Sequence, residues 1–297
     1  MSIELAKTFK FLRHAAGMED ERWFYSEVYW PERAFSSAVF VAYPLRRFYG
    51  LGQPEIIGSG TIRVLSAYSS LIQAYDRYSD TATILPSLTE IKENLLLDQM
   101  AQEVIRQVDG TGLDRGQKRD LIRMVNRSRY TLYQIEQQYS GRQLSSSEAF
   151  EWKKATGGTL LSSCVAIFNR CLSIGVEGAS VEQSAFWYGA NIQLLDDTVD
   201  VGSDILAGRQ TPVISLLKEK GEYRGVVDYT SNGRRYSFGA LRNLAPQTVS
   251  LVEQKRREYL DQVPPLFTLD GYQEICDPSL TPIIFRLYSA ASRRVSH

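Results

Sequence analysis

Residues 191–217 read NIQLLDDTVDVGSDILAGRQTPVISLL and contain the strongest pattern in the chain. Asp196, Asp200 and Asp204 follow one another at intervals of four residues. Because an α-helix turns ~100° per residue, each interval leaves only ~40° of drift, and the three aspartates share one stripe. Apolar residues flank the row, which predicts a helix over 180–206 with a row of acids beside a buried face; they are Ile192, Leu194, Leu195, Val199 and Ile205.

The row of three carboxylates allows two interpretations. A solvated acidic face is the simpler explanation of any run of charges. The flanking sequence is apolar, however, and lacks the alternating lysines of a solvated helix, which favours metal binding. Oxygen ligands without histidine or thiolate indicate a hard cation, with Mg²⁺ preferred over Ca²⁺ or Mn²⁺. Asp197 points ~100° away from the stripe, so we expect it in an ion pair or beside the ligands.

A second acidic pair lies in DRYSD, where Asp76 and Asp80 are again four residues apart at the end of an apolar helix expected over 58–80. Alone the pair is weak, because chance or a helix cap at Asp80 also explains it. Two acidic helix ends that face each other across a bundle can hold several Mg²⁺ ions. The predicted metal ligands, and the catalytic set, are Asp76, Asp80, Asp196, Asp200 and Asp204.

Helical periodicity runs along most of the chain, and glycine and proline fall at the breaks. A chain of 297 residues fits one large domain or two small ones. The consistent pattern favours an all-α protein, a single antiparallel helical bundle over 1–297. Asn232-Gly233 indicates either a small hairpin over 229–238 or a surface loop. Helices are expected over 3–16, 33–48, 58–80, 88–107, 115–140, 147–174, 180–206, 210–220, 245–262 and 280–294.

Composition and charge argue against several classes of protein. The 34 basic and 34 acidic side chains leave no basic excess, so a nucleic-acid partner is not expected. The only two histidines, His14 and His297, lie near the chain ends, which argues against hydrolytic triads and HExxH zinc sites. Neither a GxGxxG nor a GxxxxGK[ST] motif occurs.

The cysteines and the apolar runs bear on the compartment. Three unevenly spaced cysteines form neither a disulfide framework nor a zinc ligand set. Cys164 and Cys171 are expected to be buried in a helix. The N-terminus lacks the continuous apolar core of a signal peptide, and no apolar run approaches the ~20 residues that span a bilayer. We therefore expect a soluble cytoplasmic protein without membrane insertion.

With these residues in view, QLLDDTVDVGSDILAGRQTPVISLL resembles the second aspartate-rich motif of the trans-isoprenyl diphosphate synthases, including its D-x-x-x-G-basic and T-P-x-x-x-L features. Asp196, Asp200 and Asp204 also match the metal triad of class I terpene cyclases. DRYSD resembles a degenerate DDxxD first motif with Arg77 in the second position. The resemblance implies a class I terpenoid synthase bundle over nearly the whole chain. It also implies three Mg²⁺ ions that bind the diphosphate of a prenyl substrate and trigger its departure.

The resemblance also implies residues that bind the diphosphate. Lys154 lies close to where relatives place a helix cation, with Lys153 as the alternative and a surface lysine as the simpler explanation of either. Relatives have a helix break facing the substrate at the position of Gly157-Gly158. Arg209 keeps the positive charge of the motif's lysine, and Arg286 and Tyr288 resemble a C-terminal Arg-Tyr pair that closes on diphosphate. The implied set is Lys154, Gln193, Arg209, Arg286 and Tyr288.

The departures from the family pattern separate the candidate reactions. Chain-elongating synthases carry an arginine pair after the first motif, whereas TATILPSL follows Asp80 here. The N-terminal GKxxR-type sequence is also missing, and Arg46-Arg47 replaces it poorly. These absences favour a cyclase that converts farnesyl diphosphate to a sesquiterpene, a carbon–oxygen lyase. DRYSD also resembles divergent fungal cyclases of the humulene type.

Two other functions remain open, a prenyl chain-elongating or prenyl-transferring synthase and an inactive helical partner subunit. The intact triad argues against the inactive subunit, and the altered first motif keeps it open. The expected partner is the small-molecule substrate, with a homodimer also open.

Overall fold

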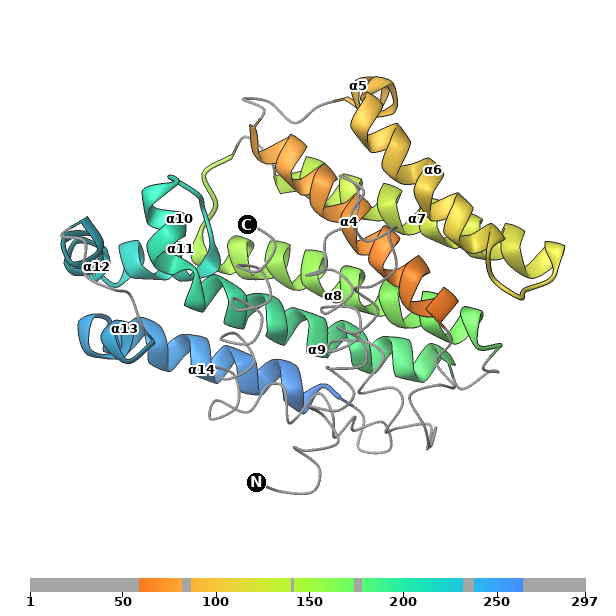
Figure 1. Ribbon diagram of the computed structural model, residues 1–297. Coiled ribbons are helices and arrows are strands. Elements are labelled where there is room, and N and C mark those ends of the chain that lie inside the picture. The colour runs from red at the N-terminus through yellow and green to blue at the C-terminus, as the bar shows by residue number, and fades with distance from the viewer. Residues whose placement is uncertain (1–58, 82–86, 140–141, 174–177, 232–237, 264–297) are drawn as a thin grey trace. The chain divides into compact units, whose positions relative to one another are not determined.

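The computed structural model describes residues 59–81, 87–139, 142–173, 178–231 and 238–263. Every regular element within these ranges is an α-helix (Figure 1), which confirms the predicted all-α fold. The helices are α4 (Ser59–Thr81), α5 (Leu88–Glu93), α6 (Leu95–Asp109), α7 (Arg115–Tyr139), α8 (Ser146–Cys171), α9 (Gly178–Val199), α10 (Val201–Leu206), α11 (Pro212–Glu219), α12 (Tyr223–Ser231), α13 (Phe238–Leu244) and α14 (Pro246–Asp261).

The chain divides into two compact units. The first holds α4, α5, α6, the part of α7 up to Tyr130, and the stretch from Ser163 to Glu182. The second holds Thr131–Ser162 and the residues from Gln183 through α14. The expectation of a single domain over 1–297 stays a prediction.

The core of the first unit forms where α4 packs against α6. Val64, Leu65, Tyr68 and Leu71 are buried on α4 at the three- and four-residue spacing that defines one helix face. Full burial of one such side chain contributes about 1.5–3 kcal/mol before the entropy of ordering is subtracted. The facing helices supply Leu97, Met100, Val104, Val108, Leu121 and Val125.

A chain of hydroxyl groups crosses this apolar core. The hydroxyl of Tyr68 lies 2.5 Å from Oγ of Ser128, and Ser128 donates to Oγ of Ser163 at 2.5 Å. Tyr68 is fully buried, and burial, followed by the nearby Cys164, raises the pKa of its phenol. Each of these three hydroxyls therefore has a hydrogen-bond partner inside the core, as buried polar groups normally do.

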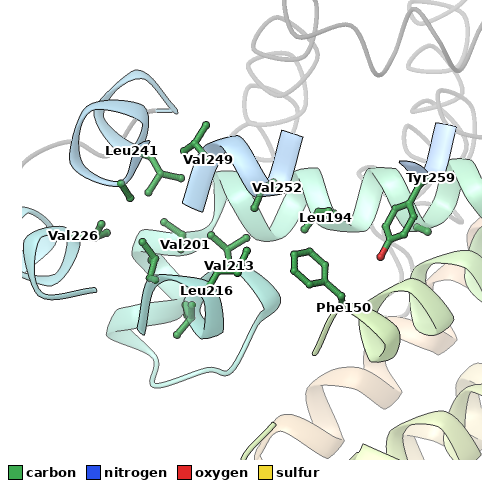
Figure 2. Close-up of a cluster of buried hydrophobic side chains, with 14 residues drawn as sticks. Phe150, Leu194, Val201, Val213, Leu216, Val226, Leu241, Val249, Val252 and Tyr259 are labelled. Atoms are coloured by element: carbon green, nitrogen blue, oxygen red, sulfur yellow. The ribbon is translucent and has the colours of Figure 1, made fainter. Parts of the chain in front are cut away.

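The second unit has its own apolar cluster, shown in Figure 2. Phe150 of α8 and Leu194 of α9 meet side chains from all five short helices that follow. This cluster determines where α10 begins, because its first residue, Val201, is fully buried there. Other members are Val213, Leu216, Val226, Leu241, Val249, Val252 and Tyr259.

A carboxylate from another helix connection caps the N-terminus of α14. Ala245 precedes that helix and offers no capping side chain. Instead, the backbone N–H groups of Gln247 and Thr248 donate to the two carboxylate oxygens of Glu222, at 3.1 and 2.9 Å. Partial burial alone would raise the pKa of Glu222, but these hydrogen bonds outweigh it and hold the pKa below its usual value. Glu222 thus ties the α11–α12 connection to α14.

The helix predicted over 88–107 is two helices in the structure. The backbone of Asn94 is extended, with φ −72° and ψ 112°, and it closes α5 while opening α6. Its Oδ1 accepts from the N–H of Leu97 at 3.1 Å, the hydrogen bond of an N-cap. Ser87 and Glu90 form a capping box at the start of α5. The N-cap at Asn94 therefore divides a segment for which hydrophobic periodicity alone predicted one continuous helix.

The helices predicted over 58–80, 115–140, 147–174, 210–220 and 245–262 are confirmed as α4, α7, α8, α11 and α14. The hairpin interpretation of 229–238 is wrong, because α12 continues through Ser231 and α13 begins at Phe238. Both of these helices were missing from the prediction, and Asn232-Gly233 lies outside the described residues. The helices predicted over 3–16, 33–48 and 280–294 also lie outside them. Within the described ranges, no helix is long and apolar enough to cross a membrane.

Candidate functional site

Helices α8 and α9 cross at three glycines in the second unit. A Cβ atom on Gly158 would lie 2.5 Å from Cε2 of Phe186, and one on Gly157 would lie 2.7 Å from the carbonyl oxygen of Gly189. A Cβ on Gly189 would overlap the carbonyl oxygen of Gly157. The expected helix break at Gly157-Gly158 is therefore wrong, because α8 runs unbroken through both residues. These glycines let two helix backbones approach closely.

The aspartate row sits where α9 ends and α10 begins. Asp200 lies between the two helices, with φ −91° and ψ 3°, so the helix predicted over 180–206 is divided there. The four-residue register survives the division, since Asp200 N–H donates to the carbonyl of Asp196 and Asp204 N–H donates to that of Asp200, each at 2.9 Å. Asp196 is partly buried, Asp200 is exposed and Asp204 is buried. The three aspartates therefore keep the spacing of one helical turn that the sequence predicted.

The carboxylates in this row repel one another. Burial is the largest cause that raises the pKa of Asp196 to about 7, and Asp200, Asp197 and Asp204 raise it further in that order. Burial also raises the pKa of Asp200, with Asp204 adding to it and Arg209 opposing it. Lys153 lowers the pKa of Asp196. A cation that binds here relieves a repulsion that the folded chain already carries.

Asp197 is as deeply buried as Asp204, with 5% of its surface exposed. Burial raises its pKa to about 6, against the charge of Lys153 and the hydrogen bond from Gln193, which lower it. Gln193 Nε2 donates to Asp197 Oδ1 at 3.1 Å. Asp197 Oδ2 is buried and has no hydrogen-bond partner among the residues described. Asp197 was expected in an ion pair or beside the metal ligands, and Lys153 is the positively charged residue that acts on it here.

The two adjacent lysines of α8 differ in their surroundings. Lys154 pairs with Glu151, and its ammonium lies 6.0 Å from the ring centroid of Trp187. Lys153 lies 4.3 Å from the ring centroid of Trp152, and its charge acts on both Asp196 and Asp197. Lys153, the alternative in the sequence argument, is thus the lysine that the structure associates with the aspartates.

The D-x-x-x-G-basic feature has a local structural reason. Gly208 has φ +68°, the left-handed conformation that ends a helix, and the N–H of Arg209 donates to the carbonyl of Asp204 at 2.8 Å. This closure turns the chain back, and Nη1 of Arg209 lies 3.3 Å from Oδ1 of Asp204. The glycine therefore allows the positive charge to return to the last aspartate of the row.

Several predicted site residues cannot be placed against this cluster. Asp76, Arg77 and Asp80 lie near the C-terminal end of α4, in the first unit, and their side chains lie outside the described residues. That they oppose the aspartate row stays a prediction. Arg286 and Tyr288 also lie outside the described residues.

The donor chemistry of the row fits a hard cation. In the described part of the chain, no three acidic, histidine or cysteine side chains converge on one metal position. The row therefore needs further oxygen ligands to complete a site. The ligands that it offers are mutually repelling carboxylates, and a buried oxygen of Asp197 beside them has no hydrogen-bond partner in the described ranges. Carboxylate donors of this kind suit Mg²⁺.

Sequence reasoning did not single out Tyr259 of α14. Val249, Val252, Arg256 and Tyr259 are buried along one face of that helix. Nε of Arg256 donates to Oδ1 of Asn191 on α9 at 2.9 Å, so the seam between α9 and α14 turns polar toward the end of α14. The signal available in the sequence was the appearance of two polar residues on an apolar helical stripe.

Comparisons with known proteins bear on the fold. No family model matches the chain, and no curated protein matches it. A geranylgeranyl pyrophosphate synthetase from the archaeon Geoglobus acetivorans aligns with a TM-score of 0.49 and 15% identity, over 87% of this chain and 98% of its own. A crystal structure of a geranylgeranyl pyrophosphate synthase aligns with a TM-score of 0.54 and 14% identity, over 95% of this chain and 92% of its own. The second likeness shows that the chain has the helical fold of a prenyl diphosphate synthase.

Proposed function

We propose that the chain is an enzyme that ionises an allylic prenyl diphosphate, with Mg²⁺ as its cofactor. The observation that carries the proposal is the row of mutually repelling carboxylates at the α9–α10 junction, beside the positive charge of Lys153. Because repulsion between these carboxylates lowers the stability of the fold, the row requires a compensating cation. The likeness of the fold to a geranylgeranyl pyrophosphate synthase supports the same chemistry.

The metal ligands in this proposal are Asp196, Asp200 and Asp204, together with Asp76 and Asp80. When bound, Mg²⁺ supplies positive charge that stabilises the departing diphosphate. Arg209 holds Asp204 from the next turn and keeps a positive charge at the edge of the row. The remaining diphosphate contacts are assigned to Gln193, Lys153 or Lys154, Arg286 and Tyr288.

Lys153 is the better supported of the two lysines. Its charge already acts on Asp196 and Asp197, whereas Lys154 is paired with Glu151. An ammonium beside the aspartates is placed to bind a diphosphate that sits over the same row. Loss of diphosphate affinity in Lys153→Ala, with little loss in Lys154→Ala, is the result that supports this assignment.

We further propose that the product is a sesquiterpene formed from farnesyl diphosphate. Departure of diphosphate leaves an allylic carbocation, which cyclises only where water is excluded. The arginines that hold a second diphosphate in chain-elongating relatives are missing after Asp80. A humulene-type skeleton, a cytoplasmic location and a homodimer belong to the same proposal.

Chain elongation is the second candidate, and a specific observation favours it. A similar solved structure is a geranylgeranyl pyrophosphate synthase, whose alignment at a TM-score of 0.54 covers 95% of this chain. Elongation adds isopentenyl diphosphate to the same allylic cation, so both candidates share the ionisation site.

Product analysis separates the two candidates. The protein is incubated with farnesyl diphosphate and Mg²⁺, with and without isopentenyl diphosphate, and the products are extracted. Cyclisation yields an unphosphorylated C15 hydrocarbon or alcohol in both incubations. A longer prenyl diphosphate that forms only with isopentenyl diphosphate overturns the cyclase and establishes the elongating synthase. Absence of diphosphate release from C10, C15 and C20 substrates overturns both.

A further inference from the structure

The second unit contains an unpaired hydrogen-bond donor as well as an unpaired acceptor. Tyr259 has 4% of its surface exposed, and its hydroxyl has no hydrogen-bond partner in the described part of the chain. Asp197 has 5% of its surface exposed, and its Oδ2 also has no hydrogen-bond partner in the described part of the chain. A buried polar atom without a partner costs about 1–3 kcal/mol. Two such atoms, one a donor and one an acceptor, therefore call for a common explanation.

The two residues lie in the same neighbourhood. Tyr259 shares the apolar cluster with Leu194, which precedes Asp197 by one helical turn on α9, and with Phe150, the residue before Glu151 on α8. Figure 2 shows the hydroxyl of Tyr259 directed to the side of the cluster where Phe150 lies. Burial raises the pKa of Tyr259, and the charges of Glu151, Glu258 and Asp197 add to this effect. The phenol stays protonated and remains a donor.

The ring of Tyr259 is held by its neighbours while its hydroxyl is uncommitted. Its centroid lies 6.0 Å from that of Trp187, and the ammonium of Lys255 lies 5.8 Å from it. The ring therefore has a defined position, and the charges of Glu151, Glu258 and Asp197 act on its phenol. A donor held in this way is prepared for an acceptor that becomes available in another state of the site.

Binding of diphosphate creates that acceptor. In the free protein, Gln193 donates to Asp197 and the charge of Lys153 favours its ionised form. Under the proposed function, on which this inference rests, both of these groups turn toward the diphosphate. Asp197 would then be a buried carboxylate deprived of its donors, which is costly unless another donor replaces them.

We propose that Tyr259 is a positioning residue that takes over Asp197 when diphosphate binds, its hydroxyl donating to the carboxylate directly or through one water. Gln193 and Lys153 are thereby released to the substrate. The exchange links α14 to the aspartate row, and it explains why neither the donor nor the acceptor has a partner within the described residues of the free protein.

The test measures the binding of inorganic diphosphate with Mg²⁺ by calorimetry, together with the thermal unfolding of the free protein. Tyr259→Phe removes only the hydroxyl, so the free protein should be as stable as the wild type or more stable. Its affinity for diphosphate should fall about ten- to a hundredfold, the loss of one hydrogen bond to a charged group. Tyr68→Phe is the matched control, because it removes a hydroxyl that already has a partner in the other unit. It should lower the thermal stability and leave the affinity unchanged.

A double-mutant cycle identifies the partner of the hydroxyl. In an Asp197→Asn background, Tyr259→Phe should no longer change the affinity for diphosphate. An equal loss in both backgrounds would show that the hydroxyl acts on another group, and it would overturn the inference. A Tyr259→Phe protein that is destabilised but binds normally would also overturn it. Wild-type protein that binds no diphosphate with Mg²⁺ would remove the proposed function, and this inference with it.

Discussion

The hydroxyl chain of Tyr68, Ser128 and Ser163 and the aspartates at the α9–α10 junction both place polar groups in a helical core, but they differ in how those groups are paired. Each hydroxyl in the chain has a partner at 2.5 Å. The aspartates repel one another, and one oxygen of Asp197 has no hydrogen-bond partner among the residues that the structure describes. The first arrangement stabilises its unit. The second lowers the stability of its unit, and the cation that we propose for this row would offset the repulsion.

The largest effect is expected from the acidic row. Asp200→Asn or Asp204→Asn should lower kcat by at least about a hundredfold, because loss of one charged group that stabilises the departing diphosphate costs that much. The thermal stability of the free protein should not fall for Asp200→Asn, since neutralising an exposed member of the row relieves repulsion. Near-normal turnover in saturating Mg²⁺ would show that the row is an ordinary acidic surface.

The next largest effect is expected where α8 and α9 meet. Gly158→Ala places a methyl group 2.5 Å from a ring atom of Phe186, and overpacking of this kind costs about 1–3 kcal/mol of unfolding free energy. Chemical denaturation measures the change. Gly225→Ala is the matched control, because no atom lies within 4 Å of its Cβ position. Alanine should stabilise α12 there by up to about 1 kcal/mol. Equal changes in the two variants would contradict the close contact.

The paired region is tested by Ser128→Ala. This variant removes the central hydroxyl of the chain and leaves Tyr68 and Ser163 without that partner, which should cost about 2 kcal/mol. Ser250→Ala, at an exposed helical position, should change the unfolding free energy by less than about 0.5 kcal/mol. If Ser128→Ala were as stable as the wild type, the hydroxyl chain would not stabilise its unit, and the contrast with the aspartate row would be wrong.

The smallest effect concerns the cap of α14. Glu222→Gln should cost about 1 kcal/mol at pH 7, the value of an N-terminal cap, because the amide accepts less strongly than the carboxylate. The pKa of Glu222 is lowered in the folded protein, so its contribution is present above the unfolded pKa near 4.3 and is lost as the pH falls below it. Unfolding curves at pH 7 and below pH 4 should therefore differ between wild type and variant only at the higher pH.

Periodicity and spacing predicted the all-α fold and five long segments that are helical in the structure. They also predicted the succession of Asp196, Asp200 and Asp204, because the four-residue register depends only on local helix geometry. The division at Asn94 was missed, since an N-cap competes with a continuous apolar pattern and leaves the periodicity unchanged. The helices α12 and α13 were missed because their apolar residues are few, and Val226 and Leu241 are buried in a cluster that several other helices build.

The candidate site was predictable to the extent that it is local. The ion pair of Arg209 with Asp204 depends on a segment of six residues that contains one left-handed glycine. The environment of Lys153 and Lys154 was not predictable, because adjacent residues on a helix face different neighbours and the choice depends on packing. The proposed role of Tyr259 could not be predicted from the sequence either, because it depends on which face of α14 packs against α9.

The crossing of α8 and α9 also has an evolutionary consequence. Gly158 meets the ring of Phe186, a side chain that can itself be replaced, so an alanine at this position is accessible through a paired substitution. Gly157 and Gly189 meet each other's carbonyl oxygens, and no side-chain exchange relieves a clash with backbone. Descendants of this sequence can therefore change the contact between Gly158 and Phe186 by two substitutions. The contact between Gly157 and Gly189 can change only if a whole helix moves.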